Sequence, residues 1–468
     1  MNEMPVTQEL AAFTAGLRLE KLPPQVVERS RFFVLDLIGN IVRARAEAES
    51  TPALLTGIAA LGLGRGSAGV FGDPARYTPM GAALLNATLG HSLDFDDTHA
   101  AGSLHPGVTA IPAALAAGEM RGATGADVLA GIVAGYEVSC RLARALPAGE
   151  HYARGFHPTA TCGTFGAAAA AGRVFGLAPE ALQSAFGIAL SQSAGSLAFL
   201  ADGAWTKRFQ VGWAAMSGLA AATFAREGFK GPLTALEGRH GFLHAYAPSP
   251  HPERALENLG ADYEIMHTAV KPYPSCRFGH AGIDAALALR LAHELRGEEI
   301  EAVRLGTSQA GMRLIGEPAE QKADPKNVVD GQFSGPFVLA VALATGRMTW
   351  DSYRLLNDPI VRGLLPKIRC EQDAEIEALL PRQMGGKVTI RARGQQFEKI
   401  VQVPKGEPES FLTEAEIRDK FASLSAPILG GARTAALADA ALGIAGLADV
   451  ASLLRAGQPA VAARLAGD

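Results

Sequence analysis

Cysteine is scarce in this sequence and is never clustered. The chain of 468 residues has four cysteines, far apart, with no Cys-x-x-Cys pair and no Cys/His spacing of the kind that holds zinc. This distribution argues against a structural metal, a disulfide framework and an iron–sulfur cluster. Any elimination chemistry is therefore expected to proceed without an iron–sulfur cluster, and we predict no cofactor.

Long apolar runs and blocks of one charge are also missing. The 43 Lys and Arg residues are scattered among 47 Asp and Glu residues. No window approaches the run of about 18 apolar residues that spans a bilayer, and the N-terminus lacks the basic and apolar segments of a secretory signal. We therefore expect no nucleic-acid partner, no membrane association and a cytoplasmic location.

Aromatic residues make up only 6% of the chain, with three Trp. The run Asp94-Phe-Asp-Asp97 matches the DxDD string of terpene cyclases, but those sites need aromatic faces around a carbocation. A calcium loop is excluded because His99 occupies loop position six, where Gly is required. The glycine-rich stretch Gly62–Gly66 follows a helical pattern rather than a strand, so we predict an ordinary loop instead of a dinucleotide site.

The sequence does contain enough apolar residues, 48%, to bury a large core in about two or three domains. The pattern is helical up to about residue 265, with many Ala and Gly residues that indicate close helix packing. It then becomes mixed and returns to helical. We predict a helical domain over 1–265, an α+β lid domain over 266–405, and C-terminal helices over 406–468 that return to the helical domain.

Local signals place several elements within these segments. Thr78-Pro79 predicts an N-cap and first turn before a helix over 80–93, and Thr124 with Asp127 resembles a capping box. Gly176 is expected to end a helix. Further expectations are a strand over 300–307, a hairpin formed by 387–392 and 396–403 around Gly394-Gln395, and a helix over 414–423 capped by Thr413.

One short stretch concentrates the titratable residues. Between His91 and His105 lie three histidines and three aspartates, which is more ionisable chemistry than any other stretch carries. Imidazole and carboxylate groups together can move protons or bind an ion. This stretch is the first candidate for a functional site.

Five sequence blocks occur in an order typical of one protein family. They are 91–98, 105–106, 156–158, 205–208 and 271–277. The blocks span nearly the whole chain and resemble the MmgE/PrpD family, which includes 2-methylcitrate dehydratase, cis-aconitate decarboxylase and iminodisuccinate epimerase. The resemblance implies a mainly α fold with a large all-helical domain and a smaller α+β lid domain. It also implies a homodimer and a site between the domains that requires no metal.

Carried over residue by residue, the resemblance implies a site made of Asp94, Thr98, His105, His157, Lys207 and Lys271. Taken singly, each residue has a plainer interpretation. Asp94 is a favoured type of helix cap, and the His-Pro pairs at 105 and 157 are common at helix starts. The two lysines alone would be surface residues. Their joint occurrence in family order favours the site.

The segment Lys271–Arg277 is expected to be extended, because its two prolines exclude a regular helix. It is suited to present Lys271, Ser275 and Arg277 to an anionic ligand, with His280 at the start of the next helix. The plainer interpretation is a rigid linker between domains.

These residue types fit chemistry next to a carboxylate. Removing a proton there creates an enolate-like dianion, which requires a base with a pKa near neutral and fixed cations around the carboxylates. We assign His105 or His157 as the base, and the other histidine or Asp94 as the acid. Lys207 and Lys271 stabilise the carboxylates. Thr98, Ser275, Arg277 and His280 are predicted to bind substrate, whereas His91, Asp96, Asp97 and His99 are expected to support the site.

We therefore predict a metal-independent lyase acting on a small di- or tricarboxylate, with a 2-methylcitrate dehydratase-like hydro-lyase as the first choice. A cis-aconitate decarboxylase-like or an iminodisuccinate epimerase-like enzyme is the alternative, because all three reactions can begin from the same carbanion-like state. A catalytically silent binding or scaffold protein is the alternative from another class.

Overall fold

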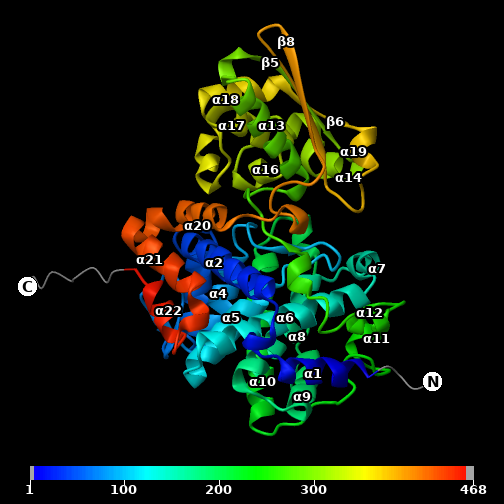
Figure 1. Ribbon diagram of the computed structural model, residues 1–468, viewed down its shortest axis with the longest axis vertical. Helices are drawn as coiled ribbons and strands as arrows, with labels where there is room; N and C mark the ends of the chain where they lie inside the picture. Colours follow the sequence, from blue (N-terminus) through cyan, green and yellow to red (C-terminus); the bar gives the residue numbers. More distant parts are fainter. Residues whose placement is uncertain (1–4, 460–468) are drawn as a thin grey trace, which may run out of the picture. The chain divides into compact units, whose positions relative to one another are not determined.

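The computed structural model describes residues 5–459, which divide into two compact units (Figure 1). The described part of the first unit runs to Ala269 and resumes at Glu414, and the second unit is Val270–Thr413. The first unit is helical with two short two-stranded ribbons, and the second combines helices with a four-stranded sheet. The predicted mainly α fold class is confirmed.

Helices of the first unit form layers around one fully buried helix. Every residue of α8 (Pro158–Phe175) is buried, and α8 packs against α5, α6 and α10. The remaining N-terminal helices surround this group. The helices of this part are α1 (Val6–Gly16), α2 (Pro24–Glu47), α3 (Thr51–Ala60), α4 (Pro79–Gly90), α5 (Gly107–Arg121), α6 (Gly125–Ala145), α7 (Ala148–Ala153), α9 (Pro179–Leu190), α10 (Thr206–Arg226), α11 (Phe242–Tyr246) and α12 (Pro252–Leu256).

Small residues let these helices approach closely, as the Ala and Gly content indicated. A Cβ atom at Gly218 of α10 would lie 2.4 Å from the Cβ of Ala167 in α8. At Gly212 it would lie 2.0 Å from the hydroxyl oxygen of Thr88 in α4. Such distances are far below van der Waals contact, so α10 can pack against α4 and α8 only with glycine at these positions.

The predicted helix ends mostly agree with the structure. Thr78 accepts a hydrogen bond from the backbone N–H of Gly81, and Pro79 begins α4, as expected. The helix ends at Gly90 rather than at residue 93. Thr124 accepts a hydrogen bond from the N–H of Asp127, and Gly176 caps α8 in the left-handed conformation, with φ 71°.

The C-terminal helices belong to the first unit. They are α20 (Glu414–Leu429), α21 (Gly431–Leu442) and α22 (Ala451–Ala456). α20 and α21 pack against α2, as Figure 1 shows. Lys420 of α20 forms an ion pair with Asp36 of α2 at 2.5 Å, and both side chains are buried. A helix from the end of the chain therefore helps to bury α2, near the start of the chain.

The second unit contains a mixed sheet in the order β6-β5-β7-β8. Its strands are β5 (Ile300–Thr307), β6 (Ile368–Gln372), β7 (Gly386–Ala392) and β8 (Gln395–Val401). β5 runs parallel to β6 and antiparallel to β7, and the bounds of β5 are those predicted from the sequence. The predicted hairpin exists, but its turn is Arg393-Gly394, both with positive φ, rather than Gly394-Gln395.

Helices of the second unit pack against this sheet, and β8 remains largely exposed. α13 packs against α17 and against β7 and β8 (Figure 1). The helices are α13 (His280–Ala292), α14 (Gln309–Gly311), α15 (Ala319–Lys322), α16 (Val328–Gln332), α17 (Gly335–Thr345), α18 (Pro359–Leu364) and α19 (Ala374–Glu377).

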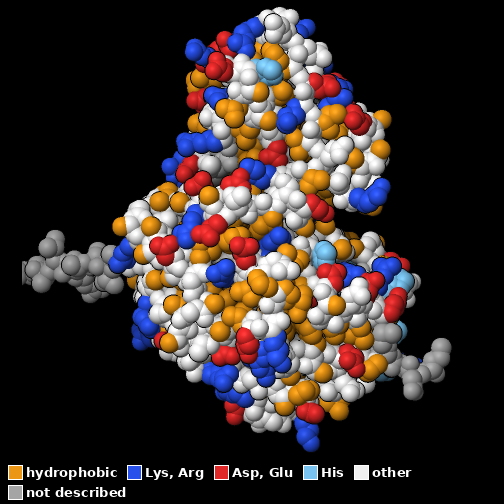
Figure 2. All heavy atoms as spheres, viewed as in Figure 1, with side chains coloured by type: hydrophobic (Ala, Val, Ile, Leu, Met, Phe, Trp, Pro, Cys, Tyr) orange, Lys and Arg blue, Asp and Glu red, His pale blue; other side chains and the backbone are white. Residues whose placement is uncertain are grey.

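Surface charge follows the scattered pattern of the sequence. Figure 2 shows basic and acidic side chains interspersed on the face that it draws. Over residues 5–459, no helix has both the length and the apolar content needed to cross a lipid bilayer.

Candidate active site

The stretch from His91 to His105 is a buried irregular loop in the first unit. It follows the end of α4 and leads to α5, and it contains the two-residue strand β3 (Thr98–His99). Asp94 has a φ of 53°, in the left-handed region that most residues avoid. No helix directly follows Asp94, so the interpretation of Asp94 as a helix cap is wrong. Backbone strain of this kind is common at functional sites.

Asp94 is instead paired with Lys207, near the N-terminus of α10. The Lys207 Nζ atom lies 2.7 Å from the Asp94 Oδ1 atom, and Lys207 is only partly exposed. Burial by itself would lower the pKa of the lysine, but the Asp94 carboxylate outweighs this effect, so the net pKa shift is upward. Lys207 therefore provides a fixed cation next to the loop rather than a free surface charge.

Two imidazoles of the loop share one carboxylate. The Nδ1 atom of His91 lies 2.8 Å from Asp96 Oδ2, and the Nδ1 atom of His105 lies 3.1 Å from the same oxygen. Asp96 is fully buried, which alone would raise its pKa, but the two histidines hold that pKa well below its ordinary value. Burial lowers the pKa of His91 to about 4, against the attraction of Asp96. Asp96 is thus an anion and His91 a neutral imidazole near neutral pH.

His157 lies at the N-cap of α8, and its side chain makes no capping hydrogen bond. His157 therefore lies at a helix start and is buried, as the plainer interpretation expected, but its side chain does not cap the helix. Burial is the largest cause of a pKa well below the ordinary value of histidine, and His91 and Lys207 lower it further. The Nδ1 atom of His157 lies 2.7 Å from the amide Nε2 atom of Gln210 in α10.

Sequence reasoning missed Gln210. It follows Lys207 by three residues, so both side chains lie on one side of α10. That spacing is the signal that could have identified it. A polar residue one turn after a proposed catalytic lysine is a reasonable candidate for a supporting contact.

The structure brings four predicted residues of the first unit together: Asp94, His105, His157 and Lys207. His91 lies between the other two imidazoles, with ring centroids 4.7 Å from His105 and 6.2 Å from His157. Thr98 lies in the middle of the same loop, in β3. Its buried hydroxyl has no hydrogen-bond partner among the described residues, so it could accept or donate a bond to a ligand.

A second set of contacts holds the loop against α5 and α6. Asp97 accepts hydrogen bonds from the Tyr136 hydroxyl and from the backbone N–H of Gly107, at the start of α5. Burial raises the pKa of Asp97 well above its ordinary value. The supporting role expected for Asp97 agrees with these contacts, because both are internal to the protein.

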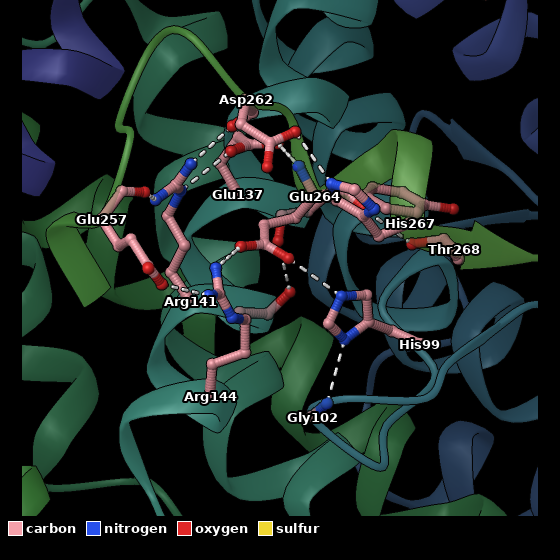
Figure 3. A network of polar contacts seen from close by, with 12 residues as sticks. His99, Gly102, Glu137, Arg141, Arg144, Glu257, Asp262, Glu264, His267 and Thr268 are labelled. Carbon is pink, nitrogen blue, oxygen red and sulfur yellow. Dashed lines mark hydrogen bonds and ion pairs between the residues drawn. The ribbon is translucent and has the colours of Figure 1, made fainter. Parts of the chain in front are cut away.

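His99 joins the loop to a distant segment, as Figure 3 shows. Its Nε2 atom donates to Glu264 at 2.9 Å, and Arg144 of α6 pairs with the other oxygen of that carboxylate. Burial would raise the pKa of Glu264, but the hydrogen bonds and charges of His99 and Arg144 lower it to about 2. Beside this contact, β3 pairs antiparallel with β4 (Thr268–Ala269).

The other predicted residues lie in the second unit. Lys271, Ser275 and His280 are buried, and the segment has no helix before residue 277, as predicted. His280 begins α13, and its Nε2 atom lies 3.1 Å from the backbone oxygen of Ser275. The Ser275 hydroxyl has no hydrogen-bond partner among the described residues. Arg277 contacts the Glu407 carboxylate through two nitrogens, so a substrate carboxylate would have to compete with Glu407.

His91, Asp96 and His105 also have donor atoms that suit a transition metal, and these atoms lie within 4.8 Å of one another. However, both Nδ1 atoms already converge on one oxygen of Asp96. Nδ1 of His91 is already hydrogen-bonded to that oxygen, so a metal at this place would have to displace that bond.

Two family models match the chain in succession. The model of the MmgE/PrpD N-terminal domain matches residues 8–255, and that of the MmgE/PrpD C-terminal domain matches residues 273–444. A relative in Aspergillus oryzae, "Cis-aconitate decarboxylase-like protein oryM", is 27% identical over 96% of each chain. A cis-aconitate decarboxylase of Aspergillus terreus is 26% identical over 96% of this chain and 95% of its own. The mouse cis-aconitate decarboxylase is 28% identical over 78% of this chain and 75% of its own.

Proposed function

Since the chain belongs to the MmgE/PrpD family, we propose that it is a lyase acting on a small di- or tricarboxylate, with loss of carbon dioxide from cis-aconitate as its first candidate reaction. The observation that carries the proposal is the cluster of the first unit. Lys207, held by Asp94, lies beside buried imidazoles that can donate and accept protons.

The chemistry of carbon dioxide loss matches what this cluster offers. When the bond to a carboxylate carbon breaks, an electron pair remains on the carbon that is left behind, and a neighbouring unsaturated carboxylate can delocalise it. A fixed cation stabilises the growing charge, and an acid must then protonate the carbon. Lys207 is suited to the first task, and His105, backed by the Asp96 carboxylate, is suited to the second.

The relatives change the order of the candidate reactions. The sequence alone favoured dehydration, with decarboxylation second. Two relatives that align with 96% of this chain carry names that contain cis-aconitate decarboxylase. An acid, a base and a fixed cation serve both reactions, so the geometry does not favour dehydration over decarboxylation. The names of the relatives therefore support decarboxylation as the first candidate.

A panel of substrates in heavy water tests the proposal. The purified protein is incubated with cis-aconitate, citrate, 2-methylcitrate and iminodisuccinate, and the products are followed by NMR and by release of carbon dioxide. We expect carbon dioxide from cis-aconitate, with one deuterium on the product carbon. A new double bond without carbon dioxide would identify a hydro-lyase, and deuterium exchange without net product would identify an epimerase. No change with any compound would favour the silent binding protein.

A further inference from the structure

The hydrogen-bond partners of the three imidazoles determine where each carries its proton. A neutral histidine has one N–H and one lone pair, and the partner of one nitrogen fixes the state of the other. Oδ2 of Asp96 accepts a hydrogen bond from Nδ1 of His91, and Nδ1 of His105 lies 3.1 Å from the same oxygen in an ion-pair contact without hydrogen-bond geometry. An ionised carboxylate can only accept, so Nδ1 of His91 carries hydrogen, and the adjacent anion favours hydrogen on Nδ1 of His105 as well. In the neutral state, Nε2 of His105 and Nε2 of His91 are therefore lone-pair acceptors.

His157 has the opposite arrangement, because its partner is an amide whose orientation is fixed. The Gln210 Oε1 atom accepts from the backbone N–H of Ser196 at 2.9 Å, and Nε2 donates to the carbonyl oxygen of Ser196 at 3.3 Å. If the amide were flipped, its NH2 group would face the N–H of Ser196 and its oxygen would face the carbonyl oxygen of Ser196. A donor would then meet a donor, and an acceptor would meet an acceptor. Nε2 of Gln210 therefore donates to Nδ1 of His157, and neutral His157 carries its hydrogen on Nε2.

We propose that the two histidines of the site have different tasks: His105 transfers the proton through Nε2, and His157 donates a fixed hydrogen bond through Nε2–H. Asp96 and Gln210 are the positioning residues that impose this difference. The inference rests on the proposed function, because it assigns roles in that reaction. It resolves which imidazole is the proton carrier, a choice that the sequence left open.

For decarboxylation the step balances as follows. The C–C bond to the departing carboxylate breaks, carbon dioxide leaves, and the electron pair stays on the remaining carbon. His105 starts as an imidazolium, gives its Nε2 proton to that carbon, and becomes neutral. Solvent then supplies a proton to His105. The side chain of His105 is 15% exposed, which permits this exchange, whereas His157 is only 3% exposed.

His157 serves without changing its charge. Burial, His91 and Lys207 keep its imidazole neutral, so its Nε2–H can stabilise charge on a substrate oxygen but is not an acid near neutral pH. Triosephosphate isomerase, a known case, uses a neutral histidine in the same way. Hydrogen bonds of this type to developing charge are worth about 10²- to 10³-fold in rate.

Several charged and titratable groups surround His105. Asp96 contacts it directly, and His91, His157 and Lys207 lie around it. Two further carboxyl groups, Asp97 and Asp36, lie near Asp96, and Asp36 is paired with Lys420. Among these groups, Asp96 is the anion that contacts the imidazole of His105, so it is the group that orients this imidazole.

The first test measures the tautomers directly and needs no substrate. ¹⁵N NMR of histidine-labelled protein, assigned with single-histidine variants, reports which ring nitrogen carries hydrogen. We expect the Nδ1–H form at His91 and at neutral His105, and the Nε2–H form at His157. The same tautomer at His105 and His157 would overturn the inference. Because this result concerns the free protein, it stands or fails separately from the identity of the substrate.

The second test measures kcat in active enzyme. Asp96→Asn removes the carboxylate charge beside Nδ1 of His105, so we expect kcat to fall by about 10²- to 10⁴-fold. Asp97→Asn is the matched control, a neighbouring buried carboxyl group, and it should lower kcat far less. Equal kcat in wild type and folded Asp96→Asn protein would contradict the inference.

The third test compares conservative substitutions. Glutamine retains an N–H donor but cannot transfer a proton. His157→Gln should therefore keep more activity than His157→Leu, whereas His105→Gln and His105→Leu should be equally inactive. Gln210→Glu should reverse the His157 tautomer and lower kcat by about 10²- to 10³-fold. Greater loss in His157→Gln than in His105→Gln would overturn the division of tasks. A wild-type protein that is inactive on every carboxylate but shows the expected tautomers would instead reject the proposed function.

Discussion

At the scale of single residues, the candidate site depends on side chains that a carboxylate partner holds in place. Asp94 holds Lys207, and Asp96 holds the imidazoles of His91 and His105. Motif order predicted Asp94, His105, His157 and Lys207, and the structure brings these four residues together. Motif order did not identify Gln210 or the shared use of Asp96, because a tautomer depends on which atoms meet in space, and residue spacing does not encode this.

Replacing Lys207 tests the cation directly. Lys207→Met keeps the aliphatic stem and removes the charge, so we expect kcat/KM for the active substrate to fall by about 10²- to 10³-fold. Lys230→Met, at an exposed position of the first unit, is the control and should retain the wild-type value. An unchanged kcat/KM in folded Lys207→Met protein would show that this lysine does not stabilise the reacting carboxylate.

At the scale of elements, long periodic segments were predictable and short ones were not. The bounds of β5 follow from the alternation of apolar and polar residues. The first turn of α4 follows from Thr78 and Pro79. The strands β3 and β4 have two residues each, which is too short to show an alternation of apolar and polar residues. Their pairing lies beside the contact of His99 with Glu264, 165 residues away in sequence. Long-range polar contacts of this kind cannot be read from local propensity.

The buried Glu264 predicts a specific dependence of stability on pH. Its pKa is about 2 in the folded protein against 4.5 for an ordinary glutamate. A lowered pKa contributes stability that is present above about pH 4.5 and is lost as the pH falls toward 2, about 3 kcal/mol in all. Chemical denaturation from pH 5 downward should show the free-energy difference between wild type and Glu264→Gln shrinking over this window.

An exposed glutamate provides the comparison for this experiment. Glu253→Gln, at a largely exposed position, should follow the wild-type curve at every pH. A constant free-energy difference between wild type and Glu264→Gln from pH 5 to the acid limit would contradict the role of Glu264 in the loop contact of Figure 3.

The close approach of α10 to α8 predicts opposite outcomes at two glycines. A methyl group at Gly218 would overlap α8, so Gly218→Ala should lower the free energy of unfolding by about 1–3 kcal/mol. Gly363 of α18 has open space around it, so Gly363→Ala should leave stability unchanged or raise it slightly. Thermal and urea unfolding measure both effects. Equal stability of the two variants would mean that α10 packs less closely than described.

At the scale of the whole molecule, the family assignment and the two units agree with the sequence pattern, whereas the assembly stays a prediction. Trp205, Phe209 and Trp213 recur every four residues along one side of α10 and are each more than 40% exposed. They line an apolar hollow of about 420 Å³ with residues of α3 and α4. Monomeric proteins rarely expose such a surface, so we expect this face to pair with a second copy of the chain.

Light scattering after size exclusion tests this expectation. The wild type should have the mass of a dimer, and Trp213→Glu should have the mass of a monomer, because a buried unpaired carboxylate opposes association. Leu291→Glu, at the most exposed large apolar residue of the second unit, should remain dimeric. A monomeric wild type would show that the exposed aromatic face has another occupant or none.

The most direct test of the central claim is a time course of cis-aconitate with purified wild-type protein in heavy water, followed by NMR with Lys207→Met in parallel. We predict release of one carbon dioxide for each substrate consumed, a single deuterium on the product carbon, and near-complete loss of both in the variant. Absence of turnover in the wild type, on cis-aconitate and on the other small carboxylates, would contradict the claim that this buried cluster is the site of a carboxylate lyase.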